Sequence, residues 1–403
     1  GDGHGHEEHG EDHHDEDEHE EEEHEEERIF ATTDSDKIDI KGSFNVNGSL
    51  LNAVDYYFRD TDYALTEQHA EEEHHDEDEH EEEGHDDHGH EEGPTTFAND
   101  ASEFGLTFIL SNNQKFVINL ADEESSVIGA ESFMNPVTSD ELTFGYFRSA
   151  EYGKFNLDLG VRLDRIDRNG SITEVHHDED EHHDEDEHHD EEEGETTFFD
   201  KSFDNISLAA NLGRELNDYF DVDFGFAVVE RAPSASELFM NGPHLVTQRF
   251  EVGNTNLSAE ESTNFEVTLN YNNDGAYSSF TMYRNSVDNY IYLMDETEEE
   301  HEEHDEEHEE GHDDHEGLTL ANFMQQNAEF EGIEFQVGRI VELASGTLDL
   351  RYSRDEVSAT FDDGHDVPRI TPARNTYSLA YSKDTMVFKL MLKDVDKLSD
   401  VAE

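Results

Sequence analysis

The chain has 403 residues and a formal net charge of −83, from 107 acidic and 24 basic residues. Nucleic acid would repel such a polyanion, so nucleic-acid binding is excluded, whereas cations suit it as partners. The absence of cysteine excludes disulfide frameworks and thiolate metal sites. Without an initiator methionine, a signal peptide or an apolar run of about 18 residues, the sequence is expected to be an internal piece of a longer chain.

Most of the charge lies in four blocks of His, Asp and Glu that contain no lysine or arginine. These blocks hold 60 of the acidic residues and 25 of the 27 histidines, and they span Asp2 to Glu27, Glu67 to Glu92, Glu174 to Glu195 and Asp295 to Glu316. The third block repeats every six residues, a period that keeps no single helical face, and its charge opposes a compact strand. We therefore expect disordered loops at 1–27, 67–93, 174–195 and 295–317.

Between the blocks, apolar and polar residues alternate as they do in strands with one apolar face. The alternation predicts about 14 strands. A medium loop containing Pro136 is expected before the fifth strand, and a long connection rich in Pro, Gly, Asn and Ser is expected after the eighth. In chain order the strands are 38–46, 50–65, 104–110, 116–120, 142–147, 155–163, 206–212, 220–228, 265–271, 277–293, 323–340, 348–352, 377–381 and 388–392.

The connections between these strands alternate between short turns and long loops. The clearest short turn is Asn272 to Gly275, which contains the Asp-Gly pair typical of tight hairpins. In an up-and-down meander, alternate connections lie at opposite ends of the sheet. The pattern therefore places all four His/acid blocks at the same end.

Two all-β architectures fit this alternation. A soluble sandwich or propeller would also alternate apolar and polar residues. Long strands with tight turns at one end and long loops at the other are more typical of an outer-membrane barrel, whose apolar face meets lipid. The strand from Phe155 to Leu163 has Asp158 and Arg162 opposite its apolar face, which suits a wet or plugged lumen. The sequence thus favours an antiparallel up-and-down transmembrane β-barrel.

Four segments that together cover most of Val228 to Arg374 are informative: Glu230 to Phe239 (ERAPSASELF), Gly253 to Ser262 (GNTNLSAEES), Asn327 to Phe335 (NAEFEGIEF) and Val367 to Arg374 (VPRITPAR). In order and spacing, these four segments resemble the barrel signature of TonB-dependent outer-membrane receptors. The acidic, His-rich insertions in the long loops are most similar to the zinc-importing branch of that family.

The resemblance implies that residues 1–403 form part of a 22-stranded plugged barrel in the outer membrane of a Gram-negative bacterium. The plug, the segment that engages the TonB complex and the closing strands are not in this sequence, so coupling to TonB is expected through a preceding part. The implied activity is import of a divalent metal into the periplasm. Outer-membrane lipid and the ion are the expected partners, with neither enzymatic activity nor a prosthetic group.

The blocks supply imidazole nitrogen and carboxylate oxygen without sulfur, a ligand set that suits zinc, nickel, copper, cobalt or manganese. Solvation alone explains acidic runs but does not explain why histidine is concentrated in them. We expect many weak, equivalent sites. The candidate ligands within the blocks are His13, His14, His19, His74, His75, His80, His176, His177, His182, His183, His188, His189, His301, His304, His308, His312 and His315.

Two further candidates lie outside the blocks. His244 belongs to a long connection and is either a fixed metal ligand in a transfer site near the barrel mouth or a hydrogen-bonded loop histidine. His365, which lies among Asp362, Asp363 and Asp366, offers the same two alternatives. Glu230 and Arg231 are expected to form a structural pair at the rim.

Two other functions fit the same residues. One is a siderophore or haem receptor in which the blocks are accessory loops. The other is a surface protein that buffers metal and transports nothing. No nucleophile elbow, HExxH, P-loop or dinucleotide fingerprint indicates an enzyme.

Overall fold

The computed structural model describes residues 29–69, 93–129, 132–174, 195–244, 247–296 and 318–397. The described chain is almost entirely β-strand, with one five-residue helix, α1 (Ala235–Phe239). No helix in these ranges has the length and apolar character needed to cross a membrane.

The strands form one sheet in which β1 to β8 and β11 to β16 follow one another in chain order, and each pairs antiparallel with the next. This confirms the expected all-β up-and-down meander of about 14 strands. Two short strands, β9 and β10, are attached beside β13. The bounds are β1 Ile29–Asn45, β2 Leu51–His69, β3 Thr95–Leu110, β4 Gln114–Gly129, β5 Met134–Tyr152, β6 Phe155–Glu174, β7 Glu195–Glu215, β8 Phe220–Arg231, β9 Asn241–His244, β10 Arg249–Val252, β11 Glu260–Asn273, β12 Ala276–Asp295, β13 Thr319–Leu343, β14 Gly346–Phe361, β15 Arg374–Lys383 and β16 Met386–Val395.

Most of these strands are longer than the alternation predicted. The apolar pattern marks only the part of each strand that carries the apolar band, whereas the backbone ladder continues beyond it through polar residues. The medium loop expected around Pro136 is wrong, because this residue lies within β5. The register between β4 and β5 shifts between Ser125 and Val127, opposite Pro136, and a bulge is where a strand tolerates a residue without an N–H.

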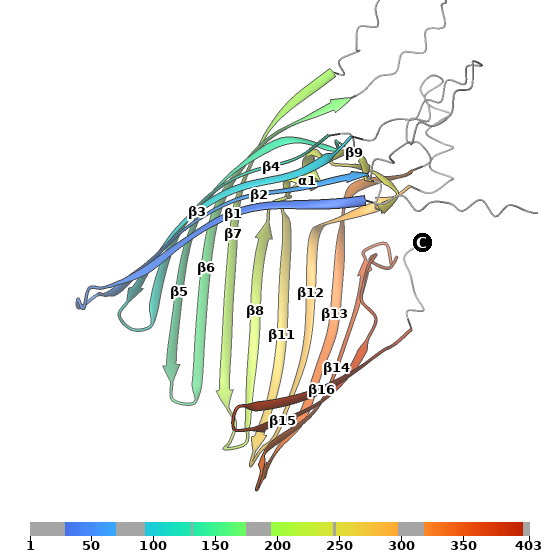
Figure 1. Ribbon diagram of the computed structural model, residues 1–403. Coiled ribbons are helices and arrows are strands. Elements are labelled where there is room, and N and C mark those ends of the chain that lie inside the picture. Colours follow the sequence, from blue (N-terminus) through green and yellow to red (C-terminus); the bar gives the residue numbers. More distant parts are fainter. Residues whose placement is uncertain are drawn as a thin grey trace, which may run out of the picture.

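The ends of the strands form two opposite edges of the sheet, distinct from its outer strands β1 and β16, and these two edges differ as the sequence predicted. Seven tight turns lie along one edge of the described sheet, and the turn between β11 and β12 has positive φ at both Asp274 and Gly275. At the other edge, the strand ends that flank all four His/acid blocks lie together: Ile29 pairs with His69, Glu174 with Glu195, and Asp295 with Ala321. Figure 1 shows these ends at the top of the sheet.

The two faces of the sheet differ equally. A row of paired apolar residues crosses the first five strands on one face, through Ile40, Phe58, Phe104, Leu120 and Leu142, and the first four are more than one third exposed. The opposite face is polar, as lumen-facing residues of membrane barrels are.

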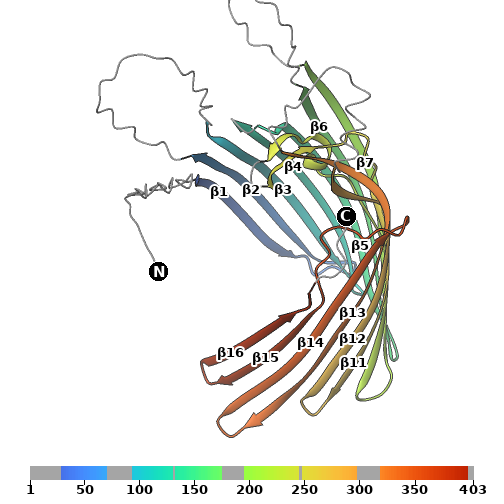
Figure 2. The ribbon, with the colours of Figure 1, turned by 90° about the vertical axis from the view of Figure 1, so that its right-hand side faces the viewer.

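Hydrogen bonds link the side chains of this polar face. The Tyr57 hydroxyl donates to Glu103, and Thr143 donates to Asp164. Figure 2 shows the sheet curved into a trough. Within the described residues no pairing joins β1 to β16, so the sheet is an open part of a barrel.

Candidate functional site

The connection between β8 and β11, residues 232–259, contains α1, β9 and β10 at the block-bearing edge, and we call its described part (232–244 and 247–259) the strut. Its helix α1 begins with a capping box, in which Ser234 accepts from the backbone N–H of Glu237 while the Glu237 carboxylate accepts from the N–H of Ser234. This reciprocal pair satisfies two orphan donors of a short helix. The helix can then present Leu238 and Phe239 on its buried side.

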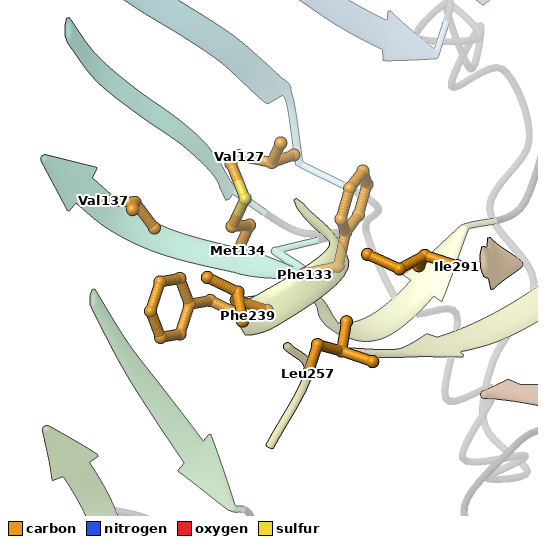
Figure 3. Close-up of a cluster of buried hydrophobic side chains, with 8 residues drawn as sticks. Val127, Phe133, Met134, Val137, Phe239, Leu257 and Ile291 are labelled. Atoms are coloured by element: carbon orange, nitrogen blue, oxygen red, sulfur yellow. The ribbon is translucent and has the colours of Figure 1, made fainter. Parts of the chain in front are cut away.

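The strut is fixed to the polar face of the sheet by an apolar cluster (Figure 3). Gly170 explains how the helix approaches so closely, since a Cβ there would lie 2.7 Å from the Phe239 ring. Gly170 lies on the same face of β6 as Asp158 and Arg162, so the strut is on the polar side, within the curve of the trough (Figure 2). The buried members of this apolar cluster are Val127, Phe133, Met134, Val137, Leu238, Phe239, Leu257 and Ile291.

Beyond α1, the strut connects two distant parts of the sheet. The N–H of Asn241 donates to the carbonyl of Phe133 beside β5. From there β9 turns back as β10, and β10 pairs in parallel with the start of β13, where Arg249 lies opposite Thr319. The strut therefore extends from β5 and β6 to the strand that follows the fourth block.

Charged groups join the strut to its neighbours. Arg231 donates to Glu260 at 2.6 Å and to both oxygens of Glu237 at 2.9 and 3.1 Å. The expected pair between Glu230 and Arg231 is therefore wrong. Adjacent strand residues point to opposite faces, and Glu230 instead accepts from the backbone N–H of Ile206.

His244, the last residue of β9, is held in a fixed position. Its Nδ1 lies 3.0 Å from Oε1 of Glu251, whose side chain is only 8% exposed, and its ring stacks on Phe133 with centroids 5.2 Å apart. Thr247 donates to the same Glu251 oxygen. Within the described chain Nε2 of His244 has no hydrogen-bond partner. The ring is thus fixed through Nδ1, and the side chain is 28% exposed.

The strut also contacts Asp295, the residue at which the fourth block begins. Arg249 binds both carboxylate oxygens of Asp295, with Nε to Oδ1 at 2.6 Å and Nη2 to Oδ2 at 2.7 Å. The next residue, Glu296, accepts from the side-chain amide of Asn322. The bidentate pair between Arg249 and Asp295 belongs to the stronger class of charge-assisted hydrogen bonds.

His365 lies in the connection between β14 and β15, residues 362–373, in a different environment. Its side chain is 85% exposed, and Nδ1 is 3.5 Å from Asp363. The backbone N–H of His365 and the amide of Gln326 donate to Asp363 and lower the pKa of this carboxyl below its usual value. His365 is therefore bound to a local turn and is not brought to His244.

The 17 candidate histidines of the blocks, His13 to His315, lie outside the described residues. Within the described ranges, no three His, Asp or Glu side chains come together as a ready-made ligand set. Sequence reasoning missed Glu251 as the partner of His244 and Arg249 as the partner of Asp295. Only the pairing of β9, β10, β13 and β12 brings these residues together. The sequence did hold one signal, since the strut connects two clearly predicted strands and was therefore expected near the barrel mouth.

The comparison with protein families decides the class of this barrel. The family model described as "TonB dependent receptor-like, beta-barrel" matches residues 22–392. The chain belongs to this family. Its members are outer-membrane transport receptors, so the resemblance seen in the sequence is confirmed at the level of the family.

Solved structures of the TonB-dependent receptor fold resemble this barrel. The copper transporter OprC is 13% identical with a TM-score of 0.62, and the match covers 92% of this chain and 52% of that chain. The Serratia marcescens hemophore receptor HasR, in complex with its hemophore HasA and heme, is also 13% identical, with a TM-score of 0.58 over 91% of this chain and 58% of that chain.

A third relative is the ferric-catecholate import receptor Fiu from E. coli K12, which is 12% identical with a TM-score of 0.51 over 88% of this chain and 52% of that chain. At such identities these likenesses describe the fold alone. The chain spans about half the length of the structures it matches.

Proposed function

We propose that the chain is the barrel part of an outer-membrane receptor that captures zinc through its His/acid blocks and imports it into the periplasm. It acts as a transport receptor and not as an enzyme, and it carries no prosthetic group. Energy coupling comes from the TonB complex through a part of the protein beyond this sequence. The cargo is the free divalent ion.

The observation that carries this proposal is the common position of the four blocks. Their flanking strand ends all lie at one edge of a receptor-family sheet, and 25 of 27 histidines belong to the blocks. Excess negative charge attracts cations over a range of about 8 Å at physiological salt, and imidazole then provides direct ligation. Capture at the outer edge followed by transfer at the mouth is the sequence of events this arrangement supports.

The ligand chemistry favours zinc among the divalent ions. The blocks contain no cysteine or methionine, so the soft sulfur ligands that select Cu(I) are missing. Imidazole and carboxylate together suit Zn²⁺. Cu²⁺ binds such ligands more tightly than zinc does, and availability therefore decides between the two ions in the cell.

We propose His244 as the fixed ligand that receives the ion beneath the blocks. The His244–Glu251 pair supports this role because the Glu251 carboxylate fixes the ring orientation through Nδ1, so that Nε2 is the nitrogen that would bind an ion. The block histidines are the first ligands in this scheme.

Growth of cells under zinc limitation tests the proposal. Three versions of the intact gene are compared: the natural one, one without the four blocks, and one in which every block histidine is replaced by asparagine while the acids remain. Zinc capture by imidazole predicts that both altered versions fail to support growth at low zinc. Normal growth of the asparagine version would contradict the assignment of histidine as the ligand.

The same cells distinguish the two alternatives. A siderophore or haem receptor would support growth on its chelate with or without the blocks. A surface metal buffer would also lose zinc binding when the block histidines are replaced by asparagine, but even the natural version would deliver no zinc to the periplasm. A periplasmic zinc sensor measures that delivery directly.

A further inference from the structure

Four exposed basic side chains lie along the tight-turn edge of the sheet, and we call them the basic margin. Each of them pairs with the first residue of a strand that follows a tight turn. The pairs are Arg148 with Gln114, Arg214 with Phe155, Arg339 with Ala276 and Lys383 with Met386.

The arginines of the basic margin project from the apolar face of the sheet. Arg148 lies six residues beyond Leu142 on β5, so the two side chains share a face. Directly paired residues also share a face, and Arg148 pairs with Leu159, which pairs with Ala210. Ala210 lies four residues before Arg214 on β7. A further row of pairs continues from Arg214 to β13, four residues before Arg339, through Val222, Leu269, Phe280 and Phe335.

The protein does not neutralise the basic margin. Within the described chain, none of its four side chains forms an ion pair or a hydrogen bond with a carboxylate, and this includes Asp218 and Asp384 in the neighbouring turns. The strand residues that share their face over 144–152, 206–214 and 333–343 include no acid. Arg214 instead stacks on the Phe155 ring, with its guanidinium carbon 4.9 Å from the ring centroid. Its N–H donors therefore remain available to an acceptor from outside.

Arginines nearer the block-bearing edge of the same face behave differently. Arg165, which pairs with Leu142, contacts Asp167 at 3.3 Å and Asp204 at 3.4 Å. Arg284, which pairs with Phe265, contacts Glu329 and Glu331. Acids are abundant in this chain, so guanidinium groups without one at a single margin indicate that the anion comes from a partner.

We propose that the basic margin binds anionic phospholipid, whose headgroups meet the barrel at the tight-turn edge. Exposed apolar side chains on the same face, such as Leu212 at 39%, require acyl chains, which places the margin at the level of the headgroups. The planar guanidinium matches two oxygens of a phosphate, and the ammonium of Lys383 adds a point charge. An acidic protein fits less well, because it would have to displace lipid from the adjacent apolar residues.

The opposite margin of this face makes the surface selective for one leaflet. There Asp62 pairs with Asp100, and Asp122 pairs with Asp140. These acids lie on the apolar face, since Asp122 follows two residues after Leu120. Anionic headgroups are repelled at the block-bearing edge and attracted at the tight-turn edge. This surface is separate from metal capture and does not depend on the cargo proposed above.

Spin-labelled phospholipids test the proposal with the intact receptor in phosphatidylcholine bilayers. Phosphatidylglycerol and phosphatidylcholine with the same acyl-chain label are compared, and the immobilised fraction of each spectrum gives their relative association with the protein. One basic side chain near an anionic surface contributes about fivefold, and the measurement averages over all lipid positions, so a preference of about two- to fivefold for phosphatidylglycerol is expected. A ratio of about one for the natural receptor would overturn the proposal.

A pair of matched double variants locates the surface. Arg148→Gln with Arg214→Gln should lower the preference by about half, because two of the four basic groups are lost. Arg165→Gln with Arg284→Gln removes the same charge from the same face, but these arginines already have acids as partners, and the preference should remain. Equal losses in the two double variants would show that only net charge matters and would overturn the assignment to the basic margin.

Two further measurements separate charge from folding. Arg148→Lys with Arg214→Lys keeps the charge and should retain most of the preference, whereas each single Arg→Gln variant should lose part of it. Salt at about 1 M shortens the screening length from about 10 Å at 0.1 M to about 3 Å and should weaken the preference. A preference that is insensitive to salt and unchanged in the single variants would contradict a role for these side chains. Zinc uptake by the same samples reports separately on the proposed function.

Discussion

The strut and the connection of residues 362–373 leave the same edge of the same sheet, and each carries one histidine among acids. In the strut, His244 stacks on Phe133 and bonds to a nearly buried Glu251. In the other connection, His365 is 85% exposed and contacts only a neighbour in its own turn. A histidine accompanied by acids therefore gives unequal sites in the two connections, because packing against residues distant in sequence fixes one imidazole and leaves the other exposed to solvent.

The largest effect on the difference between the two histidines is expected from removing the Phe239 ring, which anchors the strut that holds His244. Phe239→Ala should cost about 3–5 kcal/mol of docking free energy, because a fully buried ring leaves a cavity behind. Limited proteolysis of the membrane-embedded receptor should then cut within residues 232–259. Phe198→Ala, at a position that is 81% exposed, provides the control and should leave the strut protected.

A smaller disturbance comes from the strand beneath the helix. Gly170→Ala puts a Cβ 2.7 Å from the Phe239 ring, so the helix must shift, at a cost of about 1–3 kcal/mol. Gly160→Ala on the same face of β6 meets nothing closer than 3.9 Å and should be neutral. Hydrogen exchange of the α1 backbone measures both, and equal exchange in the two variants would mean that Gly170 is not there for this contact.

The two histidines themselves can be exchanged for asparagine one at a time. His244→Asn should raise the zinc concentration for half-maximal growth by about tenfold, which corresponds to about 1.4 kcal/mol of lost ligation. His365→Asn should change it less than about twofold, since an exposed side chain in a local turn contributes little. A larger effect at His365 than at His244 would reverse the assignment of the fixed ligand.

The smallest effect is expected from pH, which should change zinc uptake by the blocks gradually. Neighbouring carboxylates favour the charged imidazolium and raise histidine pKa values, so protons compete with metal more strongly as pH falls through the histidine range. Zinc uptake measured by calorimetry should therefore be weaker at about pH 5.5 than at about pH 7.5. Unchanged uptake between these two values would show that imidazole is not the main ligand.

Much of the fold could be predicted because membrane barrels repeat a simple pattern. Alternation located every strand of the meander, and the tight turn at Asp274 and Gly275 was visible as a residue pair. The polar extensions of the strands could not be predicted, since no apolar face marks them. The segment around Pro136 was misassigned because a proline normally ends a strand, and only the register shift against β4 shows why it is tolerated.

The sequence by itself determined the family, the order of the strands and the single edge to which the His/acid blocks attach. These properties depend on the local alternation of apolar and polar residues, on the residues of the turns and on the number of strands between the blocks, and each of these can be read from the sequence. Only the tertiary structure decided that His244 meets Glu251 and that Arg249 holds Asp295, a residue 46 positions away. Such contacts arise from the pairing of strands distant in sequence, and no local pattern encodes which side chains that pairing brings together.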